Sequence, residues 1–202
     1  MFKKFAAEAF GLSDIGVIIE AKDYDKVDAD DYLFHEDKEK IYFLIKSKKD
    51  EYCFTNLALI HVDGESAISA KRTIRRYDYA QYAIANVSIE TAGTVDLDIE
   101  LKFTIGEKAF SIDVRKNHIE ALKDMYKALH TIGKLQKRDE VGRSHAISAA
   151  SVLGSMLKLN SASEPAAAVG HYRAVLDALN DAVRDDHTRK DFSAVFEKYI
   201  HA

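Results

Sequence analysis

Two short clusters of basic side chains are the groups in this sequence most able to bind a ligand. They comprise Lys46, Lys48, Lys49, Arg72, Arg75 and Arg76. Lysine and arginine hold phosphate and carboxylate groups through charge-assisted hydrogen bonds, so the clusters predict a site for an anionic ligand. The alternative is that carboxylates pair with them on a solvated sheet. Asp50 and Glu51 directly follow the first cluster, and the expected partners of the second are Asp96, Asp98 and Glu100.

Metal and nucleophile chemistry is not indicated. None of the eight histidines stands at the His-x-x-x-His or Glu-x-x-His spacing that places two metal ligands on one helix face. In the acidic segment 22–31, an EF-hand loop starting at Asp23 would have Val27 and Asp28 where an oxygen ligand and a glycine are needed. Cys53 has no neighbouring base to lower the pKa of its thiol. We therefore predict no catalytic residue, metal or cofactor.

The charge balance argues against one class of partner. The 202 residues include 29 lysines and arginines and 33 acidic residues, a net charge of -4. A nucleic-acid-binding protein usually carries a basic excess, so nucleic acid is not an expected partner. Residues 1–10 have the apolar spacing of a short amphipathic helix, and no apolar run reaches the length of about 18 residues that indicates a membrane span. We expect a cytoplasmic protein.

The basic clusters fall within a region that is predicted to form strands. Its segments are rich in β-branched and aromatic residues and are separated by short turn signals. They are 15–20, 40–47, 51–56, 57–64, 72–79, 83–93, 94–105 and 108–114. Segment 94–105 alternates apolar and polar residues without a break, as a strand with one buried face does. Strands at this spacing, without helices between them, favour an antiparallel sandwich or barrel, with about seven strands.

One amphipathic helix follows the strands. Asn117 and Glu120 resemble a capping box at its start, and Gly133 is predicted to end it. Its apolar stripe is Ile119, Leu122, Met125, Tyr126, Leu129 and Ile132. We expect this helix to cap one end of the barrel, which places a barrel domain at residues 1–135.

Residues 136–202 differ in character from the rest of the chain. They carry helical stripes, and 158–164 is the predicted turn of a helical hairpin. About 60 residues form a marginal core by themselves, so we expect the stripes to pack on the barrel or on another copy of the chain. The residues expected in the hairpin or at an oligomer interface are Leu176, Leu179, Phe192, Phe196 and Tyr199.

Two strings resemble the bacterial pleckstrin-homology (PH) domain family. The first is EYCFTNLALIHVDG at 51–64, in which a strand ending in Phe-Thr-Asn runs into an apolar strand. The second is VSIETAGTVDLDIELKFTI at 87–105, with a Glu-Thr-Ala-Gly turn followed by Asp-Leu-Asp-x-Glu-Leu. The resemblance covers roughly 15–133 and implies a PH-like antiparallel β-barrel with a C-terminal helix. It implies no catalytic residue.

By position and helical pattern, residues 136–202 are similar to the YvbH-like oligomerisation region that follows the domain in some family members. This resemblance implies a homo-oligomer. The sequence therefore predicts a mainly β fold with added α-helices, in which a PH-like barrel is followed by an α-helical hairpin. The predicted function is that of a non-catalytic scaffold or interaction module that binds itself, with the anionic lipid or peptide site as the alternative.

Overall fold

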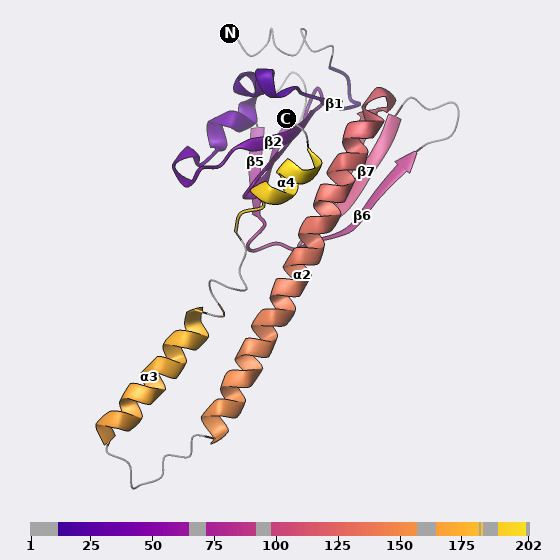
Figure 1. Ribbon diagram of the computed structural model, residues 1–202. Coiled ribbons are helices and arrows are strands. Elements are labelled where there is room, and N and C mark those ends of the chain that lie inside the picture. Colours follow the sequence, from indigo (N-terminus) through magenta and orange to yellow (C-terminus); the bar gives the residue numbers. More distant parts are fainter. Residues whose placement is uncertain are drawn as a thin grey trace. The chain divides into compact units, whose positions relative to one another are not determined.

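The computed structural model describes residues 12–64, 72–91, 98–156, 165–181, 183 and 190–200. The chain divides into two compact units (Figure 1). Met1–Gly133 and Lys190–Ala202 form the first, here called the sheet unit, and Lys134–Arg189 form the second, the helical unit. The predicted helix at 1–10 lies outside the described residues.

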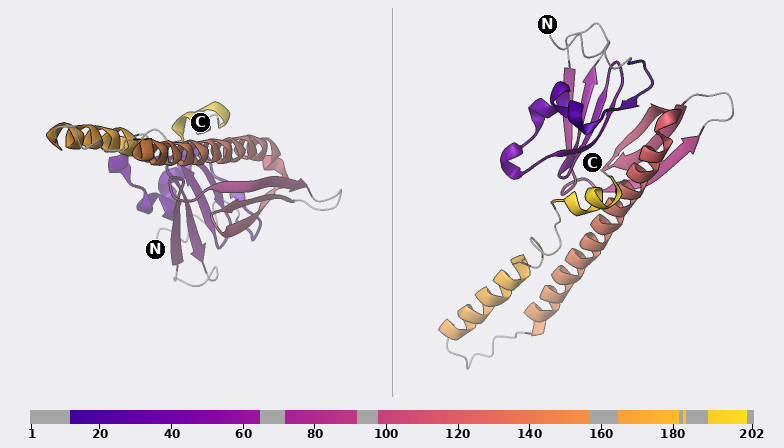
Figure 2. Two further views of the ribbon diagram at one scale, coloured as in Figure 1. Left: turned by 90° about the horizontal axis from the view of Figure 1, so that it is seen from below. Right: turned by 45° about the horizontal axis from the view of Figure 1, so that its top comes forward.

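Two antiparallel sheets form the sheet unit (Figure 2). The first has the order β1-β2-β3-β4-β5 and the second the order β6-β7-β8. The strands are β1 Val17–Ile18, β2 Ile41–Lys46, β3 Glu51–Thr55, β4 Ala58–Gly64, β5 Arg72–Asp78, β6 Ile84–Thr91, β7 Asp98–Ile105 and β8 Lys108–Arg115. Each lies within or close to a predicted segment, because alternating β-branched and aromatic residues suit a pleated surface.

The barrel predicted from the sequence is not closed. Among the described residues, β5 pairs with β4 and β6 pairs with β7, but β5 and β6 do not pair with each other. The turn after β5 explains the gap, since the backbone N–H groups of Gln81 and Tyr82 donate to the carbonyl oxygen of Asp78 and redirect the chain into the second sheet. Eight strands are described in place of the seven expected, and β1 has only two residues.

Aromatic rings fill the space between the two sheets. The ring of Phe54 in the first sheet lies 5.9 Å from that of Phe103 in the second, and Phe103 stacks on Phe110 at 5.1 Å. Ile99, Leu101, Phe103 and Ile105 of β7 are all buried, with polar residues between them. The predicted alternation is therefore confirmed over the described part of that segment.

The first sheet is buried on its other face as well. Leu44, Cys53 and Ile60 lie in one cross-strand row and belong to a second apolar cluster with Val27 and Leu33. The latter two come from the chain between β1 and β2, which contains the short 3-10 helices η1 Ala21–Lys26, η2 Asp28–Tyr32 and η3 His35–Asp37. The acidic segment 22–31 thus contributes a cover for the sheet.

The helix after the strands is longer than predicted. After the 3-10 turn η4 Lys116–His118, the helix α2 runs over Ile119–Met156, so Gly133 does not end it. A Cβ atom at Gly133 would collide with the carbonyl oxygen of Ile84, so the glycine permits a close approach of α2 to β6. Leu122, Met125, Leu129 and Ile132 are fully buried, as their spacing predicts.

The helices that follow α2 are divided between the two units. Helix α3 covers Pro165–Asp181 in the helical unit, whereas helix α4 covers Ser193–Tyr199 in the sheet unit. Residues 190–200 of the predicted 136–202 region therefore belong to the same unit as the sheets. The physical reason is that Phe192 and Phe196 find a buried aromatic site there. None of the described helices has the length and apolar character to span a membrane.

Candidate functional site

The most developed site in the described chain is the one that holds α4 against the sheet unit. Phe192 is 1% exposed and Phe196 is fully buried. The Phe196 ring stacks on Tyr42 of β2 at 5.1 Å, and the Phe192 ring meets the Tyr79 ring edge-on at 5.7 Å. A seven-residue helix is not stable alone, so these contacts are what make α4 a helix.

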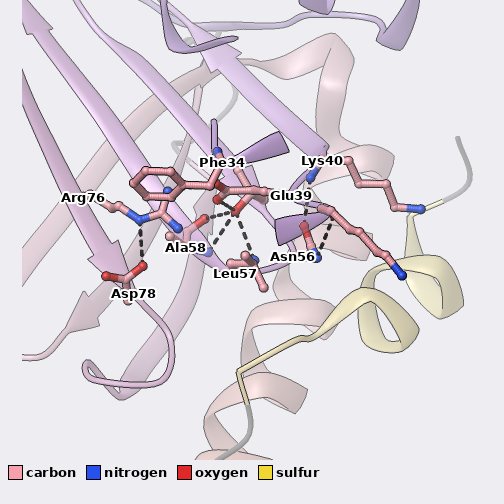
Figure 3. Close-up of polar contacts among 10 residues, drawn as sticks. Phe34, Glu39, Lys40, Asn56, Leu57, Ala58, Arg76 and Asp78 are labelled. Carbon is pink, nitrogen blue, oxygen red and sulfur yellow. Dashed lines mark hydrogen bonds and ion pairs between the residues drawn. The ribbon is translucent and has the colours of Figure 1, made fainter. Parts of the chain in front are cut away.

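Asn56, in the turn between β3 and β4, fixes the start of this segment. Its carbonyl oxygen accepts the backbone N–H of Phe192 at 2.9 Å, and its Nδ2 donates to Oδ2 of Asp191 at 3.1 Å. Its Oδ1 accepts the backbone N–H of Lys40 at 2.9 Å (Figure 3). Asn56 of the Phe-Thr-Asn string therefore connects the β3–β4 turn to Lys40, the residue before β2, and to the segment that leads into α4.

The outer side of α4 is held by Glu197. Its Oε1 accepts a hydrogen bond from the Tyr42 hydroxyl at 2.8 Å and lies 3.2 Å from Nζ of Lys40. These two donors hold the pKa of the Glu197 carboxyl below its ordinary value. Burial opposes ionisation of Asp191, but hydrogen bonds from Ser193 and Asn56 outweigh it and lower the pKa of that carboxyl.

A buried carboxylate, Glu39, lies beside the Asn56 turn (Figure 3). Its Oε1 accepts the hydroxyl of Thr55 at 2.6 Å, while its Oε2 accepts the backbone N–H of Phe34 at 2.8 Å and pairs with Arg76 at 3.0 Å. Burial would lower the pKa of the Arg76 guanidinium, but its hydrogen bonds to Glu39 and Asp78 raise it. Both oxygens of Glu39 therefore have hydrogen-bond partners. Through Thr55 and Arg76, Glu39 connects the start of β2 to β3 and β5, and this cluster is here called the Glu39 clamp.

The six predicted anion-binding residues fall at the β2–β3 turn and on β5, and five of them lie beside carboxylates. Lys48 is exposed, with its backbone N–H donating to Ser13 at 2.9 Å. The five ion pairs are Lys46–Glu51, Lys49–Asp14 at 4.0 Å, Arg72–Asp28 at 3.8 Å, Arg75–Asp63 at 2.8 Å and Arg76–Glu39 at 3.0 Å.

The partners of the β5 arginines are not those expected from the sequence. The expected strand β7 lies in the other sheet, where Glu100 pairs with Lys102 at 2.8 Å. Asp98 also lies on β7, and Asp96 is outside the described residues. The actual partners come from the chain before β2 and from β4 and β5, because β5 pairs with β4.

Titratable groups elsewhere form no obvious reactive centre. Over the described ranges, no three His, Cys, Asp or Glu side chains gather in a way that could hold a metal ion. Cys53 is fully buried, and burial raises the pKa of its thiol well above the ordinary value. The His61 ring is buried and stacks on Tyr52 at 4.6 Å, with Nε2 3.3 Å from Oδ1 of Asp50.

Most of the exposed large apolar side chains among the described residues lie in the helical unit, and the others are Tyr32, Phe34 and Tyr82 of the sheet unit. Large apolar side chains on α2 and α3 face solvent, and Tyr172 is 62% exposed. The set is Val141, Ile147, Val152, Val169, Tyr172 and Leu176. Of the predicted interface residues, Leu176 belongs to this set and Leu179 is half-buried in the same unit. Phe192 and Phe196 are in the α4 site instead, and the half-buried Tyr199 lies there with its hydroxyl 3.4 Å from Oγ1 of Thr131.

Sequence reasoning missed Glu39 and Asp191 and used Thr55 and Asn56 only as part of a family string. A Thr-Asn pair ending a strand is a turn signal, since both side chains bond to nearby backbone. Thr55 does so, accepting the N–H groups of Leu57 and Ala58 at 3.1 and 2.9 Å. A local signal does mark Asp191, whose Oδ1 accepts the backbone N–H of Ser193 at 2.7 Å. The partners Thr55 and Arg76 of Glu39, and Asn56 of Asp191, are distant in sequence and leave no local signal.

Comparisons with known proteins agree with this architecture. The family model described as "Bacterial PH domain" matches residues 9–132, and the one described as "YvbH-like oligomerisation region" matches residues 179–202. The chain is 52% identical to the uncharacterised protein YvbH of Bacillus subtilis (strain 168), over the full length of both.

A solved structure is similar as well. The crystal structure of a PH-domain-containing protein from Exiguobacterium sibiricum 255-15 is 45% identical, with a TM-score of 0.83 over 93% of this chain and 100% of that one. This match confirms the PH-like fold with its two sheets and long helix. The chain belongs to the bacterial PH domain family, and its C-terminal residues match the YvbH-like oligomerisation region.

Proposed function

We propose that this protein is a non-catalytic interaction module that self-associates through the apolar surface of its helical unit. The observation that carries the proposal is the face of α3 formed by Val169, Tyr172 and Leu176, all exposed. Their spacing of three and four residues places them on one side of the helix. Neighbouring apolar side chains on an exposed helix face are typical of a surface that binds another protein.

A second copy of the chain is the partner that best fits this face. Residues 134–189 contain eight lysines and arginines and seven acidic residues, a net charge of +1, whereas the rest of the chain carries -5. Two nearly neutral helical units therefore meet without the repulsion that two sheet units would have. The match of residues 179–202 to an oligomerisation region supports the same partner.

Light scattering of the full chain against an α3 variant tests the proposal. Val169→Asp with Tyr172→Asp puts two charges into the proposed interface, and each exchange in an exposed helix costs less than about 1 kcal/mol of stability. We expect the parent to be an oligomer at tens of micromolar and the variant to be a monomer. The control is Tyr32→Asp, a comparably exposed aromatic residue of the sheet unit. A monomeric parent, or a variant that stays assembled, contradicts the proposal.

Truncation at residue 135 is a poor test of self-association. It removes α4 and uncovers Tyr42 and Tyr79, so a change in assembly would mix two causes. Point variants in the full chain avoid this problem.

The alternative prediction of an anionic site gains no support from the basic side chains, since five of the six lie beside carboxylates. Co-sedimentation with vesicles of anionic and of neutral lipid tests it, and we expect equal, negligible binding to both. The peptide partner and the cytoplasmic location stay predictions from the sequence.

A further inference from the structure

Helix α4 lies within the segment that matches the oligomerisation region, and it is docked on the sheet unit. The matched segment 179–202 includes Phe192, Val195 and Phe196, the most apolar part of that region. All three are buried in the sheet unit, so they cannot also form an interface by packing against another copy's surface. They take part in assembly only by docking on the sheet unit of another copy.

We infer that, in the self-associated protein, α4 docks on the sheet unit of a second copy and that copies exchange this helix. The inference rests on the proposed self-association and names its means. Every contact of the site is available in either arrangement, because each copy carries the same aromatic pair Tyr42 and Tyr79 and the same Asn56 turn. Exchange therefore changes which chain supplies α4, without changing its contacts.

The fold allows this exchange without disturbing the sheets. Helix α4 contributes no strand to either sheet, and Lys134–Arg189 separate it in sequence from the rest of the sheet unit. The effective concentration for docking within one chain falls as the connection lengthens, and Lys134–Arg189 form a long connection. In an oligomer joined through α3 the sheet unit of the partner is tethered to the same assembly, so docking of α4 between chains competes with docking within one.

Polar contacts give the exchanged helix a single register. Asn56 accepts the N–H of Phe192 and donates to Asp191 at one end, while Tyr42 and Lys40 hold Glu197 at the other. Apolar contacts alone would allow α4 to shift along its axis, whereas polar contacts at both ends fix one position. The site is therefore selective for this segment of this chain, which is the property that exchange between identical copies requires.

Cross-linking of exchanged chains tests the inference. Lys40→Cys with Glu197→Cys removes the exposed polar contacts at one end of α4, and leaves the buried rings and the Asn56 contacts at the other end in place. Equal amounts of this variant with ordinary and with heavy nitrogen are unfolded together, refolded, treated with a short bismaleimide and analysed as cross-linked peptides by mass spectrometry. The buried Cys53, whose thiol pKa is raised, does not compete. The control is Glu90→Cys with Lys102→Cys, a pair on the neighbouring strands β6 and β7.

Exchange predicts that about half of the 40–197 cross-links join one ordinary and one heavy peptide, because identical copies pair at random. The 90–102 control should give none. If only same-isotope 40–197 links form while light scattering finds an oligomer, the exchange is refuted and the proposed self-association stands. If the chain is a monomer, both fail. If no 40–197 link forms, α4 is not docked in solution and the exchange is refuted as well.

Discussion

Phe196→Ala is the sharpest test of the place of α4 in this protein. The Phe196 side chain is fully buried, with its ring 5.1 Å from that of Tyr42 and 6.4 Å from that of Tyr79. Truncating a buried phenylalanine to alanine typically costs about 3–5 kcal/mol, the lost transfer energy plus the cavity left behind. We expect the free energy of unfolding to fall by that amount. At about 2–4 °C per kcal/mol for a chain of this size, the melting temperature would fall by about 10 °C.

The measurement is urea unfolding followed by circular dichroism, since the chain contains no tryptophan. Chain concentration is held fixed and then varied, because assembly adds concentration-dependent stability. The matched control is Tyr32→Ala in the sheet unit, an exposed aromatic residue whose truncation should change the free energy by less than about 1 kcal/mol. A loss below about 1 kcal/mol for Phe196→Ala would refute the reasoning, because α4 would then contribute nothing to the cooperative structure of the sheets.

Three further predictions follow from the polar groups. Glu39→Gln should lower the unfolding free energy by about 1.5–3 kcal/mol in the same urea assay, because Arg76 loses a charged partner, and an unchanged value would contradict the clamp. Cys53 should react with a thiol reagent only after denaturation, because it is buried and its pKa is raised, and rapid labelling of the native protein would count against that burial. Docking of α4 should weaken on acidification, because the contacts of the docked helix lower the carboxyl pKa values of Asp191 and Glu197 from 3.8 and 4.5. The two carboxylates therefore stabilise docking above these ordinary pKa values, and this stabilisation is lost as the pH falls through the lowered pKa values of the docked state. The urea assay over an acid titration, comparing the parent with the Asp191→Asn, Glu197→Gln variant, checks this, and a pH-independent difference between the two would contradict it.

The strands could be placed from the sequence because local pattern decides them. Alternation along β7 and the stripe of α2 are properties of neighbouring residues, and both appear in the structure as predicted. The burial of Cys53 could not be predicted in this way. It depends on Val27 and Leu33 covering the first sheet, and these lie within and just after the acidic segment 22–31, which has the composition of a solvated loop.

The candidate site was only partly accessible to prediction. Phe192 and Phe196 were recognised as apolar packing residues, but the sequence could not say what they pack against. Their partners Tyr42 and Tyr79 lie more than a hundred residues earlier, and no short-range pattern encodes such pairing. The same holds for Arg76, whose charge suggested a ligand site until its contacts with Glu39 and Asp78 were known.

The sequence by itself determined the family, the order of strands and helices and the change of character after the strands, because these follow from local periodicity and from motif residues close together in the chain. Only the tertiary structure decided that Gly133 lies within a continuous helix, that the sheets stay open between β5 and β6, and that residues 190–200 return to the sheet unit. Each of these depends on a contact between distant residues, such as Gly133 with Ile84 or Asn56 with Asp191. The free energy of such contacts comes from burial and from paired polar groups, and neither is visible until the chain has folded.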